Sequence, residues 1–383
     1  MFPSLCEVST DQLKEAVKKL LQFLHETLQI SGAHTVDFYT QDIWKKLVAV
    51  SPETVLSAFS KHNGTSHHIG KEVPELSSIF SNQQLVNIEA FVEASHSHSL
   101  VNMGICTSVD ELLEALAVHK AGSPDLKTDQ FMNDKKSHEV LIMSQLVQSI
   151  ANICGVKQES IMVGLHTCGD LAPNTLRIFT AKPEIKAVCS VGCCYHLLSE
   201  EFESPEEEIT VTTWGFPMSI HLKESSWFFG RNARMSACLA LERVAVGQGL
   251  ATESLFYRAV LQVILKDCFS VTQSDKRVGK IFSKSGNFTE YVRKSLKKLG
   301  HDDSELSDME IMEYFEKYKP RKNEMEAFNM LKVLLAPCIE ALILLDRLLY
   351  LKEQNNLAWS GLVKLFDPVK SPRCYAVVSM KKV

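Results

Sequence analysis

Residues 160–196 read SIMVGLHTCGDLAPNTLRIFTAKPEIKAVCSVGCCYH, and this stretch decides the fold class. The apolar runs at 160–166 and 185–191 are short and continuous, which is typical of strands buried on both faces of a parallel sheet. Between them, 171–180 has the apolar spacing of a helix, with Asp170 in position to cap it. A strand, a helix and a strand within about thirty residues form a βαβ unit. The sequence therefore predicts an α/β protein with a parallel sheet.

Helical patterns flank this unit on both sides. Residues 1–125 predict a helical N-terminal region in which no strand pattern is recognisable. Residues 225–355 predict a large helical insertion that includes one helix at 231–246, and the apolar segments after it predict a C-terminal β-hairpin. We therefore expect an N-terminal region at 1–125 and a second domain at 130–383 that carries the insertion.

The composition argues against several classes of protein. A net charge of −5 does not favour a protein that coats nucleic acid by charge alone. The first twenty residues mix charged and apolar side chains and lack the apolar core of a secretory signal. The most apolar stretch, 331–350, contains Glu340, Asp346 and Arg347, which argues against a membrane span. The eleven scattered cysteines predict reduced thiols, so we expect a cytoplasmic or nuclear protein without a membrane.

Polar clusters follow both predicted strands, running from His166 to Asp170 and from Gly192 to His196. Ligands of open α/β sheets bind outside the carboxyl ends of the strands. We therefore expect both clusters to face one crevice, with His166 and His196 close together on one side of the sheet. The alternative is that Asp170 only caps a helix and the cysteines are small core residues.

The same clusters raise the question of a metal site. His166, Cys168, Cys193, Cys194 and His196 are all potential zinc ligands. However, adjacent residues on an extended strand face opposite sides, which spoils the geometry for a pair of neighbouring cysteines. We therefore expect reduced cysteines and no metal.

Each of two further motifs allows a structural explanation. Gly247 and Gly249 form the only tight glycine pair, but they follow a helical segment, so they predict a helix C-cap rather than a nucleotide loop. Arg231 and Arg234 lie on one face near a helix N-terminus. Phosphate binding and structural hydrogen bonding both remain open for this pair.

Strings spread over almost the whole chain resemble the methyltransferase-like protein twenty-five family. They are KKSHEV (135–140), VGLHTCGDL (163–171), VGCCYH (191–196), WGFPM (214–218), GRNARMSACLALER (230–243), LFDP (365–368) and SPRCY (371–375). The resemblance implies a seven-stranded class I, Rossmann-like sheet and methyl transfer from S-adenosylmethionine. It suggests RNA as the methyl acceptor and leaves a protein acceptor open. In a complete chain, the group formed by His166, Asp170, Tyr195 and His196 would surround the transferred methyl, orienting or deprotonating the acceptor.

The chain departs from the family pattern at one place. In the family, the glycine-rich first strand that cradles the donor directly follows a segment like 153–158. Here the fourth strand follows at once: only 24 positions separate His138 from Met162, and a helix fills most of them. One βαβ unit alone needs about 30 residues. We therefore expect an incomplete sheet, in an isoform that lacks the glycine-rich cofactor loop and the acid for the ribose.

This loss leads to three expectations. The chain is expected not to bind S-adenosylmethionine, so that the family's methyl transfer is impaired. Its alternative role is that of a non-catalytic isoform that acts as a binding or regulatory protein. The strand at 161–165 becomes a sheet edge without charges, which predicts self-association.

Overall fold

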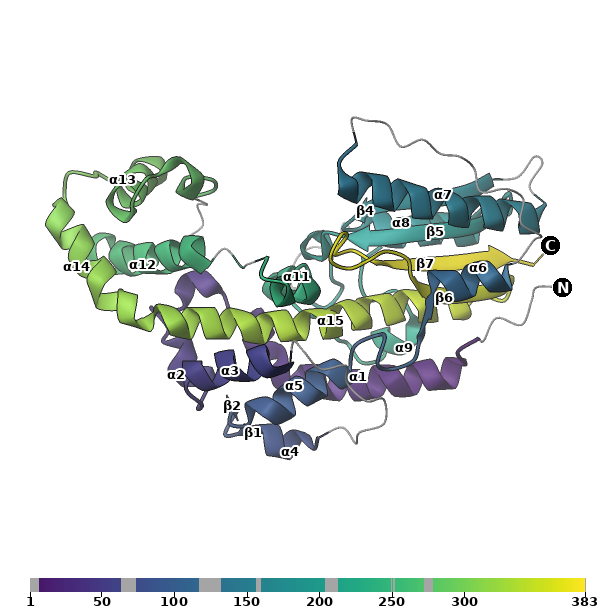
Figure 1. The fold of residues 1–383 in the computed structure, drawn as a ribbon, viewed down its shortest axis with the longest axis horizontal. Helices are drawn as coiled ribbons and strands as arrows, with labels where there is room; N and C mark the ends of the chain where they lie inside the picture. Colours follow the sequence, from purple (N-terminus) through teal and green to yellow (C-terminus); the bar gives the residue numbers. More distant parts are fainter. Residues whose placement is uncertain are drawn as a thin grey trace.

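The computed structural model describes residues 7–62, 74–116, 132–155, 160–203, 213–248, 250, 252–271 and 278–382. Within these residues, one long helix runs beneath a five-stranded sheet and extends well beyond it (Figure 1).

The main sheet has the strand order β3-β6-β7-β5-β4. Its members are β3 (Cys106–Ser108), β4 (Ser160–Cys168), β5 (Ile185–Cys193), β6 (Leu357–Lys364) and β7 (Tyr375–Lys381). Strands β4 and β5 run parallel, as the βαβ prediction requires, and β7 runs antiparallel between β5 and β6. The α/β class and the C-terminal hairpin are thereby confirmed, and the sheet is consistent with an incomplete Rossmann-like fold.

Helices cover both faces of this sheet. On one face lie α6 (Val109–Ala115) and α7 (Asp134–Cys154), and on the other lie α8 (Leu171–Ala181) and α15 (Lys322–Lys352). Successive strand residues alternate between the two cores, as the pleat requires. On β5, Ala187 belongs to the α7 core, whereas Val188 belongs to the α8 and α15 core. Burial on both faces explains why β5 is an almost continuous apolar run.

The N-terminal helices pack mainly against α15. The elements here are α1 (Thr10–Gly32), η1 (Thr35–Asp37), α2 (Ile43–Leu47), α3 (Pro52–His62), α4 (Leu76–Ile79), β1 (Phe80–Ser81), β2 (Gln84–Leu85) and α5 (Ile88–Ser97). The expectation that this region has no strands was wrong. In particular, β3 pairs in parallel with β6. It was missed because three residues, Cys106, Thr107 and Ser108, are too few and too polar to make a strand pattern.

The helical insertion lies between β5 and β6. Its elements are η2 (Tyr195–Leu197), α9 (Ile220–Lys223), α10 (Arg231–Ser236), α11 (Leu241–Ala245), α12 (Thr252–Phe269), η3 (Phe282–Lys284), α13 (Phe288–Leu299), α14 (Asp308–Tyr318), η4 (Lys319–Arg321) and α15. The single helix expected at 231–246 is broken into α10 and α11. The break has a cause, because the Arg373 guanidinium donates to the carbonyls of Ala237 and Leu239 (2.7 and 3.3 Å). Gly247 follows α11 with a positive φ, as expected of a helix C-cap residue.

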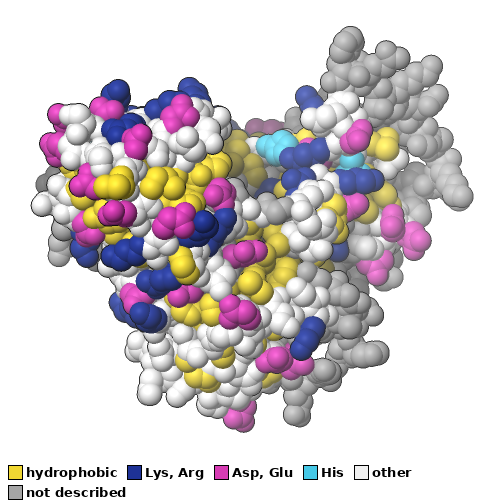
Figure 2. Space-filling model, turned by 60° about the vertical axis from the view of Figure 1, so that its left-hand side comes forward, with side chains coloured by type: hydrophobic (Ala, Val, Ile, Leu, Met, Phe, Trp, Pro, Cys, Tyr) yellow, Lys and Arg dark blue, Asp and Glu magenta, His cyan; other side chains and the backbone are white. Residues whose placement is uncertain are grey.

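Acidic and basic side chains are interspersed over the face turned forward in Figure 2. On the insertion, Lys294 is paired with Glu290, and Lys297 is paired with Asp303 (2.5 and 3.3 Å). The lysines of α13 are thus largely balanced by acidic neighbours, which does not favour this helix as a nucleic-acid surface.

Helix α15 carries buried charges through the centre of the molecule. By length and composition, the helical segment from Asp308 to Lys352 could cross a membrane, but 89% of its most apolar window is buried inside the protein, as in a core helix. Asp346, 1% exposed, accepts hydrogen bonds from the backbone N–H groups of Met218 and Ser219 (2.7 and 2.9 Å) and from the Ser219 hydroxyl (2.7 Å). This carboxylate therefore ties the 213–219 segment to α15.

Strand β4 is an edge of the main sheet. Among the described residues it pairs with β5 alone. Helix α7 is capped by Gly155 in a left-handed conformation, and β4 begins at Ser160. The family order implied an edge here, since strand 4 of a doubly wound sheet normally lies beside strand 1, and this expectation is confirmed.

The variant Asp346→Asn tests how much the hydrogen bonds of the buried Asp346 carboxylate contribute to stability. In Asp346→Asn one acceptor oxygen becomes an NH₂ group, which leaves a buried backbone N–H unpaired. We expect the free energy of unfolding at pH 7 to fall by about 1–3 kcal/mol. Glu353→Gln is the matched control, because Glu353 also accepts backbone N–H groups, from Ile220 and His221, at a more exposed position. Equal losses in the two variants by urea denaturation would contradict this account.

Candidate functional site at the ends of strands β4 and β5

The carboxyl ends of β4 and β5 lie side by side, as predicted. The two strands are parallel, and Cys168 on β4 is the direct partner of Cys193 on β5. Both polar clusters therefore lie at one edge of the sheet, where α/β proteins bind their ligands.

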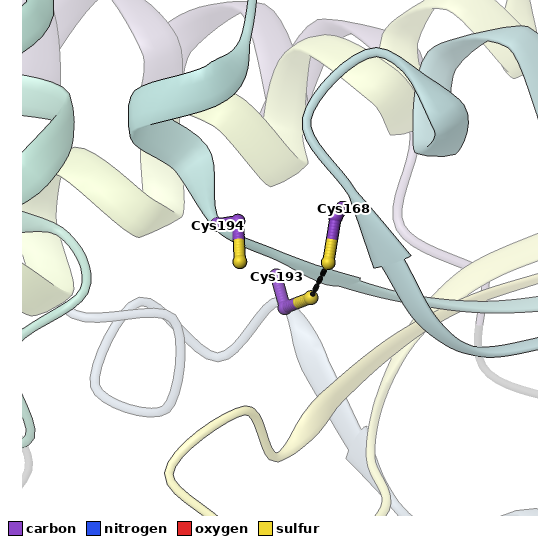
Figure 3. A group of neighbouring side chains, drawn as sticks. All are labelled: Cys168, Cys193 and Cys194. Atoms are coloured by element: carbon purple, nitrogen blue, oxygen red, sulfur yellow. Dashed lines mark hydrogen bonds between the residues drawn. The ribbon is translucent and has the colours of Figure 1, made fainter.

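Three cysteines converge at this edge (Figure 3). The sulfur atoms of Cys168, Cys193 and Cys194 all lie within 4.8 Å of one another, and those of Cys168 and Cys193 are 2.9 Å apart. The expectation that Cys193 and Cys194 diverge was wrong. It assumed an extended strand, whereas Cys194 has φ 48° and ψ 49°, so the strand has already turned. Burial first, and then the neighbouring thiols, raise the pKa of Cys193 above the usual range.

Tyr195 is a core residue at this end of the sheet. Its side chain is 1% exposed, and its hydroxyl donates to Glu340 of α15 (2.7 Å). The guanidinium groups of Arg347 and Arg373 lie 5.9 and 5.6 Å from its ring, within the range of a cation–π contact. Burial is the main reason that the pKa of Tyr195 is raised. Gly192 leaves room for the end of the Arg347 side chain, which would have to shift if a Cβ were added.

Asp170 fixes the loop that follows β5. It stands at the N-terminus of α8, but its side chain makes no capping bond, contrary to expectation. Its Oδ1 instead accepts the backbone N–H of Ser199 (2.9 Å). A Cβ at Gly215 would collide with the Asp170 carboxylate, which explains the glycine of the WGFPM string.

The two histidines contact different helices. In β4 one extra residue is inserted between Gly164 and Thr167, and His166 lies in this bulge with its Nε2 3.3 Å from Glu139 of α7. His196 places Nδ1 3.7 Å from the sulfur of Cys238, which follows α10. Since α7 and α10 pack on different layers, the pairing of His166 with His196 on one side of the sheet was wrong.

Glu139 was not singled out as a functional residue. It is 2% exposed, and it contacts His166, Lys135 (3.5 Å) and the hydroxyl of Ser371 (2.6 Å). Its presence in the KKSHEV string was the available indication. A buried carboxylate behind a half-exposed imidazole can orient the ring toward a bound acceptor. Glu340, Arg347 and Arg373 were also missed, although two of them stand out as charges in an apolar helix.

Arg234 has a structural position. It is 3% exposed, and its guanidinium lies 3.1 Å from Glu200 and 2.7 Å from Glu203, and it also donates to the Leu198 carbonyl. Of the two explanations left open for this arginine, structural hydrogen bonding is the one that the contacts support. Burial raises the pKa of Glu200 to about 7, although Arg234 and two backbone N–H groups oppose the shift.

The raised pKa of Glu200 has a consequence for stability. Between its ordinary value of about 4.5 and about 7, Glu200 is protonated in the folded chain and ionised in the unfolded chain. The free energy of unfolding should therefore fall as pH rises through this window, with a contribution of up to roughly 3 kcal/mol. Urea denaturation between pH 4.5 and 7.5 should show a smaller fall for Glu200→Gln than for the unaltered chain. Parallel curves for the two proteins would refute this.

The matches to known proteins include the region of the candidate site. A family model described as "Methyltransferase domain" matches residues 114–201, which include both polar clusters. The human "Probable methyltransferase-like protein 25" is 39% identical over 586 aligned positions, covering 97% of each chain, and its mouse counterpart is 38% identical over 577 positions with the same coverage. No solved structure matches the chain significantly.

The length of these alignments is itself informative. Each is longer than the 383 residues of this chain. Many positions of the relatives therefore have no counterpart here, although both chains are covered almost from end to end. With this identity over nearly its full length, the chain belongs to the methyltransferase-like protein 25 family.

Proposed function

We propose that this chain is a methyltransferase-family protein in which binding of S-adenosylmethionine, and hence methyl transfer, is lost or strongly reduced. The observation that carries the proposal is that β4 forms the edge of the sheet. In doubly wound sheets, the cofactor binds at the switch point next to strand 1, on the loop that follows that strand. Within the residues that the structure describes, no strand lies on that side of β4 to supply the loop.

The connection between α7 and β4 supports this proposal. Only five residues, 155–159, separate Cys154 at the end of the helix from Ser160 at the start of the strand. Three strands with their helices cannot fit into such a connection, because a single βαβ unit takes about 30 residues. The alignments that exceed the length of this chain support the same explanation.

The residues expected around the methyl acceptor, unlike the donor loop, are present in this chain. In a complete chain, His166 would be the group best placed to take a proton from the acceptor, since its ring is half-exposed and held by Glu139. Asp170 and Tyr195 would then support the strand ends from within the fold. His196 remains a candidate for orienting the acceptor, which we propose to be an RNA or a protein.

Titration calorimetry with S-adenosylmethionine tests the loss of donor binding. We expect no saturable heat for this chain, because the loop that cradles the donor is missing. The human relative, at 39% identity, is the positive control for the reagents and conditions. A micromolar dissociation constant for this chain would disprove the proposal.

A second role, as a non-catalytic binding protein, is favoured by exposed apolar side chains on β4 and α8. Val163 on β4 is 44% exposed, and Leu171 and Ile178 on α8 are 57% and 46% exposed. Large apolar side chains exposed on a surface are candidates for contact with another protein. The unpaired backbone of β4 adds hydrogen-bonding groups that another strand can use. We propose a second copy of this chain as one partner for this edge.

A charge on the edge strand should prevent such pairing. Val163→Lys is expected to keep the protein monomeric at concentrations where the unaltered chain associates, as measured by size-exclusion chromatography with light scattering. Val101→Lys is the control, because it alters an equally exposed valine outside the main sheet, at 49% exposure. The idea fails if the unaltered chain stays monomeric throughout, or if Val163→Lys associates as strongly.

A further inference from the structure

We infer that Cys168, Cys193 and Cys194 form a thiolate site for a divalent cation of the zinc class. This site is separate from donor binding and does not depend on the function proposed above. The three sulfur atoms lie within 4.8 Å of one another, at the ends of two neighbouring strands.

The spacing of the sulfurs suits the metal. Zinc binds thiolate at about 2.3 Å, and tetrahedral angles then place two sulfurs about 3.8 Å apart. The pair Cys168 and Cys193, now 2.9 Å apart, needs to open by less than 1 Å, roughly, to reach this spacing. A rotation of the exposed Cys168 side chain can provide this movement.

The backbone at Cys194 is the second observation. A residue other than glycine with φ 48° is uncommon, and such conformations cluster at functional sites. Here the turn brings a third sulfur toward the two that the strand register already places together (Figure 3). A disulfide uses only two sulfurs, whereas a metal ion can be bound by all three.

The exposure of the three cysteines indicates a metal site that solvent can reach, with one coordination position open. Cys193 is buried, Cys194 is partly buried and Cys168 is exposed, so the ion has a path from solvent. With three protein ligands, zinc keeps its fourth position for water or a small ligand. Among the described residues, this group comprises the three cysteines alone.

A bound metal would stabilise the β4 edge of the sheet. Strand β4 has one neighbour in the described structure, and its last residue, Cys168, would be joined through the ion to two residues at the end of β5. An ion that binds the folded chain and not the unfolded one stabilises the fold.

Cobalt substitution and zinc competition test the site in the full chain. Metal-free, reduced protein is titrated with Co²⁺, and we expect one equivalent to give the intense visible bands of tetrahedral cobalt with a thiolate charge-transfer band. Zinc should displace the cobalt and raise the melting temperature. Cys194→Ser and Cys168→Ser should weaken zinc binding by at least about tenfold. Cys268→Ser, at an exposed cysteine on α12, should leave binding unchanged.

Three outcomes would overturn the inference. The first is a pale octahedral cobalt spectrum. The second is zinc affinity that does not change in Cys194→Ser, checked to melt like the unaltered protein without metal. The third is a Cys168–Cys193 disulfide found by mass spectrometry in protein purified with zinc and without reductant.

Discussion

The short connection between α7 and β4 is the constraint on which the rest of the structure depends. Five residues cannot carry the chain through three further strands between α7 and β4, and in the described part of the chain the sheet ends at β4. The unpaired side of β4 follows from this connection, and the proposed loss of donor binding rests on it.

The strands beyond β5 and their packing against α15 explain how this fold remains stable. Strand β5 keeps two neighbours, and its β7 partner is itself paired with β6. Helix α15 then joins the sheet to the N-terminal helices through a large apolar core. Buried charges on the same helix hold the loops after β5, with Asp346 on the 218–219 backbone and Glu340 on Tyr195. The ends of the strands are therefore held by contacts with α15.

Local patterns predicted most of the fold. The βαβ unit and the hairpin follow from apolar spacing and capping residues, which act over a few positions. The features that were missed depend on distant residues. Arg373 breaks the helix expected at 231–246 by taking its carbonyls, and β6 provides the partner that makes Cys106–Ser108 a strand. Neither interaction can be recognised from the residues next to it in the sequence.

The candidate site was predicted in its location but not in its geometry. That both clusters lie at the strand ends follows from topology alone. The left-handed turn at Cys194 and the bulge at His166 each change the direction of a side chain, and neither position carries a glycine to indicate it. As a result, the cysteines converge where divergence was expected, and the histidines contact separate helices.

Hydrogen exchange of the β4 amides tests the central claim most directly. In an edge strand of a parallel sheet, about half of the backbone N–H groups point away from the only neighbour. The account predicts that alternate amides in 161–164 exchange much faster than those of β5, which is paired on both sides. Uniform protection along β4, equal to that of β5, would show that another strand closes this edge and would contradict the account.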